Sequence, residues 1–344
     1  MMRGSSDTIA RADPAAVRES DLAAARAGNE RAFARLVEPL RSELHAHCYR
    51  MLGSVHDADD ALQDALLRAW RGIARVRDAA AVRSWLYTIS TRVCLDASAA
   101  RARRALPMDL GPAAESLRLE AAPRDDVAWL TPLPDPEGAF DERLDVRLAF
   151  VAALQHLSGN QRAALLLFEV LGFSAAEIAE MLDTSVASVN SALARARRVL
   201  ASRAPERGAG ESVDTAAHTR QAARFAEALE RGDVDLFTSL LADDVTWAMP
   251  PLAEWYRGAR TVAEFAAAVP MARCGDWRSV AIEANGCPAV AMYLRAEPGG
   301  RFEAWSINVL GVGVGVDGDR ITEITSFLAP DLFARFDLPL NLGR

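Results

Sequence analysis

The sequence predicts a multidomain protein in which two all-α domains precede one α+β domain. Apolar side chains recur at helical spacing over two stretches, from Leu22 to about residue 105 and from Phe140 to about Ser202. Beyond residue 214, two helical stretches lead into short runs rich in Val, Ile, Trp and Tyr that alternate with Gly, Asp and Pro. Helices followed by strands indicate an α+β domain with a curved, mostly antiparallel sheet.

Changes in composition set the domain boundaries. Residues 1–20 lack an apolar stripe, so we expect a mobile tail there. The longer linker contains six prolines, which prevent a continuous helix, yet its Trp129, Leu130 and Leu133 are apolar enough to dock on a neighbouring domain. The expected divisions are a tail at 1–20, a helical domain at 21–105, a linker at 106–140, a helical domain at 141–203, a linker at 204–214 and the α+β domain at 215–340.

Composition also limits the function classes. The chain has 344 residues and a formal net charge of −8, so any nucleic-acid contact has to come from local basic patches. Its four cysteines form no C-x-x-C pair, we identify no secretory leader, and no apolar run approaches the ~20 residues that span a bilayer. We therefore expect a cytoplasmic protein without membrane contact. His45, His47 and Cys48 lie close in sequence, but residues two apart do not share a helical face, so we expect no metal site.

The second helical domain contains a more specific pattern. Ser158 with Gln161, and Ser174 with Glu177, have the spacing of two successive capping boxes, each at the start of a helix. A turn at 183–185 then leads into a third helix. The apolar side chains of that helix recur at spacings of three and four, at Val186, Val189, Leu193, Ala196 and Leu200.

The opposite face of the third helix carries short polar side chains followed by arginines, and no acidic residue occurs from Thr184 to Arg203. Such a helix can enter the major groove of DNA with its N-terminal end while the arginines contact phosphates. We interpret the segment as a helix-turn-helix. A helix pair with a merely basic surface would show the same periodicity.

The segment from about Asp141 to Arg203 resembles region 4 of bacterial RNA polymerase sigma factors of the extracytoplasmic-function type. In that family, region 4 reads the −35 promoter element, and the polymerase β flap is among its partners. The resemblance implies DNA contacts from Ser185, Ser188, Val189, Asn190, Ser191, Arg195 and Arg198.

The first domain contains the acidic stretch DADDALQDALLRAW. Four polar side chains lie three or four residues apart on one helical face, where like charges cost about 0.2–0.5 kcal/mol per pair unless a basic partner neutralises them. The stretch resembles the sigma region that binds the coiled coil of the polymerase β′ clamp. The alternative is a solvated acidic face. The contact implied by the resemblance consists of Asp57, Asp60, Gln63 and Asp64.

Downstream, RSWLYTISTRVCLDASAARARR resembles sigma regions 2.3 and 2.4, where promoter DNA is opened and non-template bases are held. Phosphates need cations, and flipped bases need pockets and stacking surfaces. The loop 71–80 is expected to capture a base, and Trp85 is expected in the core. The residues implied as contacts to the −10 element are Arg83, Tyr87, Arg92, Arg101, Arg103 and Arg104.

The third domain resembles the cone-shaped SnoaL-like, NTF2-like fold, most specifically in the stretch ERGDVDLFTSLLADDVTWAMPPLAEWYRGARTVAEF. A sheet curled around a helix makes a pocket at its open end. An unknown small ligand, or docking within the chain, is the expected interaction of this domain. The residues expected to line the pocket, or alternatively to fill the cone, are Trp247, Met249, Trp255, Tyr256, Phe265, Trp305 and Phe327.

An enzyme on this fold needs an acid and a base with shifted pKa in an apolar pocket. The single histidine after residue 214, His218, lies near the start of the domain. Turn and strand-edge roles account for Asp243, Asp244, Asp276 and Glu283. We therefore expect no catalytic residue and no cofactor, and a binding or docking role for the domain.

Taken together, these patterns predict an alternative sigma factor that binds core RNA polymerase, directs it to promoters, and is regulated in cis by its third domain. One alternative is a one-component helix-turn-helix regulator, which would bind its DNA site without polymerase. A second alternative is a DNA-binding protein fused to a SnoaL-like enzyme, which would show a closed pocket with paired polar groups of perturbed pKa.

Overall fold

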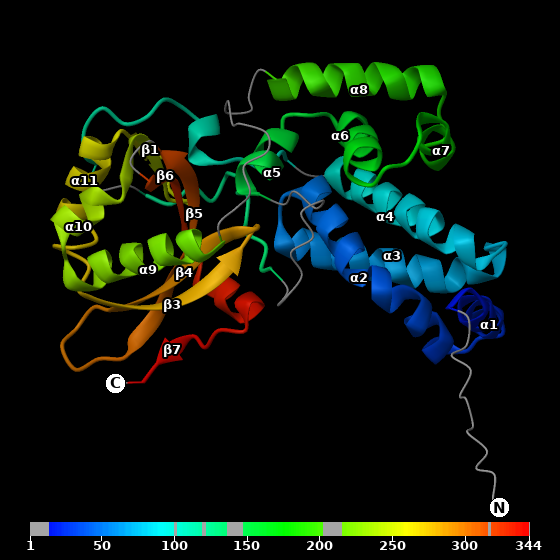
Figure 1. The fold of residues 1–344 in the computed structure, drawn as a ribbon, viewed down its shortest axis with the longest axis horizontal. Helices are drawn as coiled ribbons and strands as arrows, with labels where there is room; N and C mark the ends of the chain where they lie inside the picture. The colour runs from blue at the N-terminus through cyan, green and yellow to red at the C-terminus, as the bar shows by residue number, and fades with distance from the viewer. Residues whose placement is uncertain are drawn as a thin grey trace, which may run out of the picture.

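The computed structural model describes residues 14–99, 102–118, 122–135, 147–201, 215–315 and 318–343. The linker expected at 204–214 and most of the tail expected at 1–20 lie outside these ranges. Figure 1 shows the helices of the first domain on one side, the sheet of the third domain on the other, and the second domain above the first.

Helices of the first domain pack as a bundle around buried apolar side chains such as Leu44, Met51 and Leu86. Asn29 and Ser54 accept hydrogen bonds from backbone N–H groups in the first turns of α2 and α3, which fixes where these helices begin. Gly53 ends α2 in the left-handed conformation with a φ of 69°. The helices are α1 (Pro14–Arg26), α2 (Glu30–Leu52), α3 (Val55–Gly72) and α4 (Val82–Ala99), with short 3-10 turns η1 (Ile73–Arg75) and η2 (Ala79–Ala81).

The prediction of a mobile tail at 1–20 is wrong from Pro14 onward, because helix α1 begins there. Its next turns bury Leu22 and Ala25, and Asp21 pairs with Arg35 of α2 at 2.5 Å. The apolar stripe recognised in the sequence starts only at Leu22, after the helix has begun.

In the second domain, both predicted capping boxes are present, at Ser158 with Gln161 and at Ser174 with Glu177. Asp183 turns the chain with a φ of 53°, and the third helix begins at Val186, as predicted. The elements are α5 (Leu148–Leu154), α6 (Gly159–Leu165), a π-helical turn η4 (Leu166–Val170), α7 (Ala175–Met181) and α8 (Val186–Ala201).

A single mixed sheet in the order β2-β1-β6-β5-β4-β3 forms the third domain, with β7 paired to β5. Within the described residues, all strand pairs are antiparallel except β1 with β6, which agrees with the expected mostly antiparallel sheet. The strands are β1 (Leu241–Ala248), β2 (Trp255–Arg257), β3 (Asp276–Ala284), β4 (Cys287–Arg295), β5 (Phe302–Gly315), β6 (Gly318–Phe327) and β7 (Asn341–Leu342). The helices are α9 (Thr215–Arg231), α10 (Val234–Ser239), α11 (Ala259–Ala268) and the 3-10 segment η5 (Pro330–Phe336).

The two faces of this sheet belong to different cores. The inner face packs on α9, α10 and α11 through residues such as Trp247, Val290 and Ile324. The outer face, with Ala291 and Ile307, joins one continuous core with both helical domains and the linker. The third domain is thus packed against the helical part of the chain (Figure 1).

Most of the described linker is docked on its neighbours. Leu130 and Leu133 are buried, as expected, whereas Trp129 is only partly buried and donates its indole N–H to the carbonyl of Arg124. Backbone hydrogen bonds tie Ala114 to Trp255 and Arg124 to Pro251 of the third domain. The prolines prevent a helix, and the freed backbone groups bond instead to both domains.

Candidate nucleic-acid and polymerase interfaces

The predicted recognition helix α8 presents a polar N-terminal end to solvent. Ser185, Ser188, Asn190 and Ser191 are exposed, and the hydroxyl of Ser185 accepts a hydrogen bond from the backbone N–H of Ser188 at 3.2 Å. Val189 is buried, so it does not reach a groove as the resemblance implied. Its place on the predicted apolar stripe explains this correction, because a side chain on that face packs on α6 and α7.

Val186 deviates from the stripe in the opposite sense, since its side chain is 44% exposed at the start of α8. Among the arginines of α8, Arg195 and Arg198 are exposed, and Arg197 donates to Glu169 at 2.9 Å.

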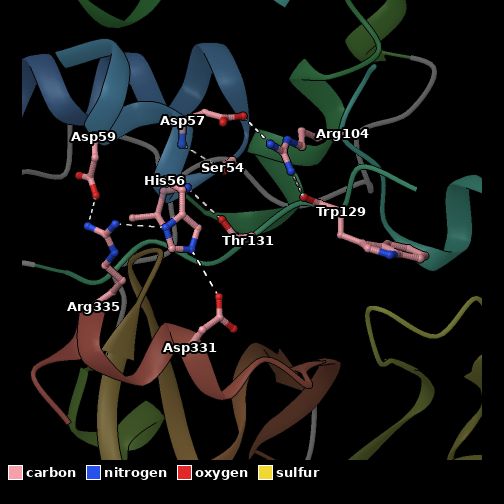
Figure 2. A network of polar contacts seen from close by, with 10 residues as sticks. Ser54, His56, Asp57, Asp59, Arg104, Trp129, Thr131, Asp331 and Arg335 are labelled. Carbon is pink, nitrogen blue, oxygen red and sulfur yellow. Dashed lines mark hydrogen bonds and ion pairs between the residues drawn. The ribbon is translucent and has the colours of Figure 1, made fainter. Parts of the chain in front are cut away.

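On α3, the four residues of the predicted clamp contact separate into two groups. Asp60 and Gln63 are exposed, and Asp64 is half exposed and pairs with Arg68 at 2.8 Å. Asp57 is buried and forms an ion pair with Arg104, whose other nitrogen donates to the carbonyl of Trp129 at 3.0 Å (Figure 2). Asp57 therefore fixes the linker in this structure and does not face solvent, which corrects its expected place in the contact.

The predicted −10 face on α4 is covered by the second domain. Tyr87 lies in the core, where its ring contacts Phe173 and its hydroxyl donates to Glu43 at 3.1 Å. Tyr87 is therefore not available to stack on a base, because its ring packs between His47 and Phe173. The guanidinium of Arg83 lies 5.0 Å from both the Tyr87 and Phe173 ring centres.

The remaining arginines of this set contact neighbouring segments. Arg92 donates to the carbonyl of Met181 on α7 at 3.1 Å, and Arg103 lies within hydrogen-bonding distance of His156 after α5. Arg104 pairs with Asp57, and Arg101 lies outside the described residues. The described arginines of this set therefore lie along α4 and just after it, each against an intramolecular partner.

Arg162 on α6 fastens the second domain to the first. Its guanidinium donates to the carbonyl of Met51 at the end of α2, to Leu154 at 2.9 Å and to the amide oxygen of Gln155 at 2.9 Å. Burial lowers the pKa of Arg162 to about 10, and the side chain stays cationic at neutral pH. A buried cation with several carbonyl partners makes this packing specific for one arrangement.

A β-hairpin of the third domain inserts at the junction of α2 and the linker. The turn between β3 and β4 is formed by Asn285 and Gly286 with φ values of 57° and 64°, as a two-residue hairpin requires. The side chain of Asn285 accepts from the backbone N–H of Leu133 at 2.8 Å and donates to the Tyr49 hydroxyl at 2.9 Å. That hydroxyl in turn donates to the carbonyl of Thr131 at 2.8 Å.

Next to this turn, Asp135 accepts from the backbone N–H of Gly286 at 2.7 Å. Burial raises the pKa of Asp135 to about 6, and the charge of nearby Glu283 acts in the same direction. The linker and the third domain are therefore joined by a carboxyl group that titrates just below neutral pH.

A second contact joins η5 to the N-terminal end of α3. Figure 2 shows Arg335 reaching Asp59, with His56 between Arg335 and Asp331. The Nε2 atom of His45 on α2 also lies 2.8 Å from a carboxylate oxygen of Asp59, and burial lowers the pKa of His45. The third domain thus supplies a cation to the helix that carries Asp60 and Gln63.

The interior of the cone is filled by aromatic side chains. Trp247 contacts the rings of Phe225, Phe237 and Phe265, and Tyr256 stacks on Phe265 with ring centres 4.5 Å apart. Met249 is also buried there, so these predicted residues follow the alternative of filling the cone.

Three other predicted lining residues lie elsewhere. Phe327 packs on the outer face of the sheet, within the core shared with the helical domains. The side chain of Trp255 donates to the carbonyl of Gly111 in the linker at 2.9 Å, and Trp305 is 41% exposed beside Trp277. The register of β4 with β5 shifts at Trp305, so this residue departs from simple alternation. Phe327 follows the inward-facing Ile324 by three residues and Trp255 precedes the inward-facing Tyr256, so alternation turns both away from the cone.

Sequence reasoning missed the side chains that join the domains, namely Tyr49, Arg162, Asn285 and Arg335. The dipeptide Asn-Gly is a signal for a tight hairpin turn, but nothing local indicates what the turn contacts. No group of three or more His, Cys, Asp and Glu residues suited to a metal ion occurs in the described ranges. Likewise, no helix within those ranges has the length and apolar character needed to cross a membrane.

Comparison with known proteins matches each domain. The profile of Sigma-70 region 2 covers residues 36–104, that of Sigma-70 region 4 covers 147–200, and that of a SnoaL-like domain covers 222–324. The chain is 40% identical over 319 residues to the ECF RNA polymerase sigma factor SigG of Mycobacterium tuberculosis, an alignment that covers 90% of this chain and 85% of the relative.

Two further relatives agree. The sigma factor SigM of M. tuberculosis is 37% identical over 180 residues, covering 52% of this chain and 81% of that protein. The crystal structure of the M. tuberculosis extracytoplasmic function sigma factor SigJ superposes with a TM-score of 0.57 at 24% identity, covering 88% of this chain and 98% of that one, and shares its fold. This chain therefore belongs to the extracytoplasmic-function sigma factors of RNA polymerase, as an alternative sigma factor with a SnoaL-like domain fused after region 4.

Proposed function

We propose that the chain binds the β′ clamp of core RNA polymerase through Asp60, Gln63 and Asp64 on α3. The exposure of Asp60 and Gln63, together with a half-exposed Asp64, supports this role. Leu67, one turn further along, is 51% exposed and adds an apolar contact beside the acids. Such a mixed polar and apolar patch suits a helical partner.

Promoter recognition is assigned to two surfaces. The exposed polar end of α8, with Ser188, Asn190 and Ser191, would enter the major groove at the −35 element, and Arg195 and Arg198 would hold phosphates. The loop between α3 and α4, expected at 71–80, and the arginines of α4 would hold the −10 element. In the present arrangement Arg92 bonds to Met181, so the second domain has to move off α4 before that surface is open.

The third domain is proposed to regulate polymerase binding in cis. The observation that carries this proposal is the contact of Arg335 with Asp59, because it places a cation of the third domain on the same helix as Asp60 and Gln63. The hairpin at Asn285 holds the linker at the same time. A difference in affinity of ~1–3 kcal/mol between docked and undocked forms would change activity roughly 5- to 150-fold.

A docking role for this domain is favoured over catalysis. The polar side chains joined inside the cone are the indole of Trp247, the hydroxyls of Ser326 and Ser306 and the amide of Asn308. None of these groups exchanges a proton near neutral pH, as general acid–base catalysis requires. Their hydrogen bonds are also satisfied by one another.

The test is run-off transcription with purified core polymerase on the DNA upstream of the gene. We expect a promoter-specific transcript from core plus the full chain, and we expect Arg335→Ala to change its amount while Arg301→Ala, at an exposed site of the same domain, does not. A protein that binds this DNA tightly without polymerase and gives no transcript would instead be a one-component regulator.

A further inference from the structure

The loop between α3 and α4, residues 72–81, is held from one side by α1. Within the loop, the side chains of Ile73 and Val76 are buried, whereas those of Arg75, Arg77 and Asp78 are exposed. An exposed loop with few buried side chains depends on bonds to its backbone for a defined shape.

Two side chains of α1 supply such bonds. Arg26, in the last turn, donates through one guanidinium nitrogen to the carbonyls of Val76 and Arg77, the latter at 2.7 Å. Glu19 accepts from the backbone N–H of Ala79 at 2.7 Å. The two side chains are seven residues apart, which places them on one face of the helix two turns from each other.

The helix that carries them is itself fixed to the bundle. Leu22 and Ala25 are buried, and Asp21 bonds to Arg35 of α2 through two guanidinium nitrogens at 2.5 and 3.1 Å. This contact lowers the pKa of Asp21, so the pair stays ionised at neutral pH. Helix α1 is therefore fixed to α2, and the loop is fixed to α1.

We propose that Arg26 and Glu19 are positioning residues that hold the loop 72–81 in the shape that selects a base of the −10 element. This inference rests on the proposed function, because the loop acts on DNA only in the polymerase-bound protein. A base-selective pocket requires a loop held in a defined conformation, since loose contacts bind different bases about equally.

The experiment uses the full chain with core polymerase and a panel of promoters that differ by single base pairs across the −10 element. We compare wild type with Arg26→Ala, Glu19→Ala and the control Arg18→Ala, which removes an exposed arginine of the same helix. Each protein is also measured for affinity to core polymerase and for its thermal unfolding midpoint.

For wild type and Arg18→Ala, we expect one −10 position at which substitution lowers transcription strongly. At that position, we compare transcription from the promoter with the preferred base to transcription from the promoter with the substituted base. Arg26→Ala and Glu19→Ala are expected to lower this ratio about fivefold, since each removes charge-assisted bonds to the loop backbone. Affinity for core polymerase stays unchanged. Arg26→Lys, which keeps the charge and one donor, restores part of the ratio.

Two outcomes overturn the inference while leaving the proposed function intact. One is an unchanged ratio in both variants. The other is an equal loss of transcription at every promoter, with a lowered unfolding midpoint, which would mean that α1 only stabilises the domain. Absence of any promoter-specific transcript from the wild type would instead reject the proposed function itself.

Discussion

The side-chain amide of Asn285 donates to the hydroxyl of Tyr49 at 2.9 Å, across 236 positions of sequence. This bond joins the third domain to α2, and the same hydroxyl donates to the linker carbonyl of Thr131. Three segments of the chain thus meet at one buried phenol. Burial raises the pKa of Tyr49 far above its ordinary value, so the phenol remains protonated and able to donate throughout the physiological range.

Tyr49→Phe is expected to loosen the junction without altering packing. The change removes the hydrogen bonds that the Tyr49 hydroxyl makes with the Asn285 amide and the Thr131 carbonyl, which costs about 1–3 kcal/mol in a buried site. Urea unfolding should show this loss in free energy. The matched control is Tyr293→Phe, whose hydroxyl donates to Pro339 within the third domain, and equal losses in both variants would contradict a special role for the junction.

Arg162→Met is expected to release the second domain from α2. Methionine fills similar volume but removes the guanidinium that donates to the carbonyls of Met51 and Leu154, at a cost of about 1–3 kcal/mol. Small-angle scattering should report a larger radius of gyration, while Arg195→Met at an exposed position should not. An unchanged radius would show that apolar contacts alone hold the two domains together.

The docking of the linker on the third domain is expected to weaken as pH rises. Burial raises the pKa of Asp135 from 3.8 to about 6, so the folded state binds this proton more tightly than the unfolded chain. The associated stability is fully present below about pH 3.8 and is lost as pH increases through about 6.

The variant Asp135→Asn mimics the protonated carboxyl at every pH. Its free energy of unfolding should therefore exceed that of wild type by an amount that grows from pH 4 to pH 6 and then levels off, at most about 3 kcal/mol. Urea titrations of both proteins across this range measure the difference. A difference that does not depend on pH would contradict the raised pKa.

Salt dependence distinguishes the arginines of α8. If Arg195 and Arg198 each neutralise one phosphate, alanine at either position should reduce the slope of log affinity against log salt by about 0.9 for polymerase holoenzyme on promoter DNA. Arg197 already bonds to Glu169, so Arg197→Ala should change the slope less. If all three variants kept the wild-type slope, this face would not contact phosphates.

The helical domains could be predicted closely because their signals are local. Capping boxes at Ser158 and Ser174 and the turn before Val186 depend on residues within one turn of each other. The burial of Tyr87 was not predictable in this way, because Phe173 from the next domain covers it. Asp57 likewise has the sequence position of a surface acid, and its burial depends on the distant Arg104.

In the third domain, too, local features could be predicted, whereas the face on which some side chains lie could not. Its strands and its Asn-Gly turn follow from composition, and Tyr256 and Phe265 fill the cone. Phe327 lies on the other face, because it is three residues from the inward-facing Ile324 and successive side chains of a strand alternate between the two faces. Helix α1 was not predicted before Leu22, since the sequence shows no apolar stripe there.

Because the ribosome synthesises the chain from its N-terminus, the hydrogen bond between Tyr49 and Asn285 can form only late in synthesis. Tyr49 emerges 236 residues before the side chain that completes its hydrogen bonds. At ~5–20 residues per second, this interval lasts roughly 10–50 s, ample time for the nascent α-helical bundle to fold. Each newly made molecule therefore passes through a stage in which α2 and α3 lack their contacts with the third domain.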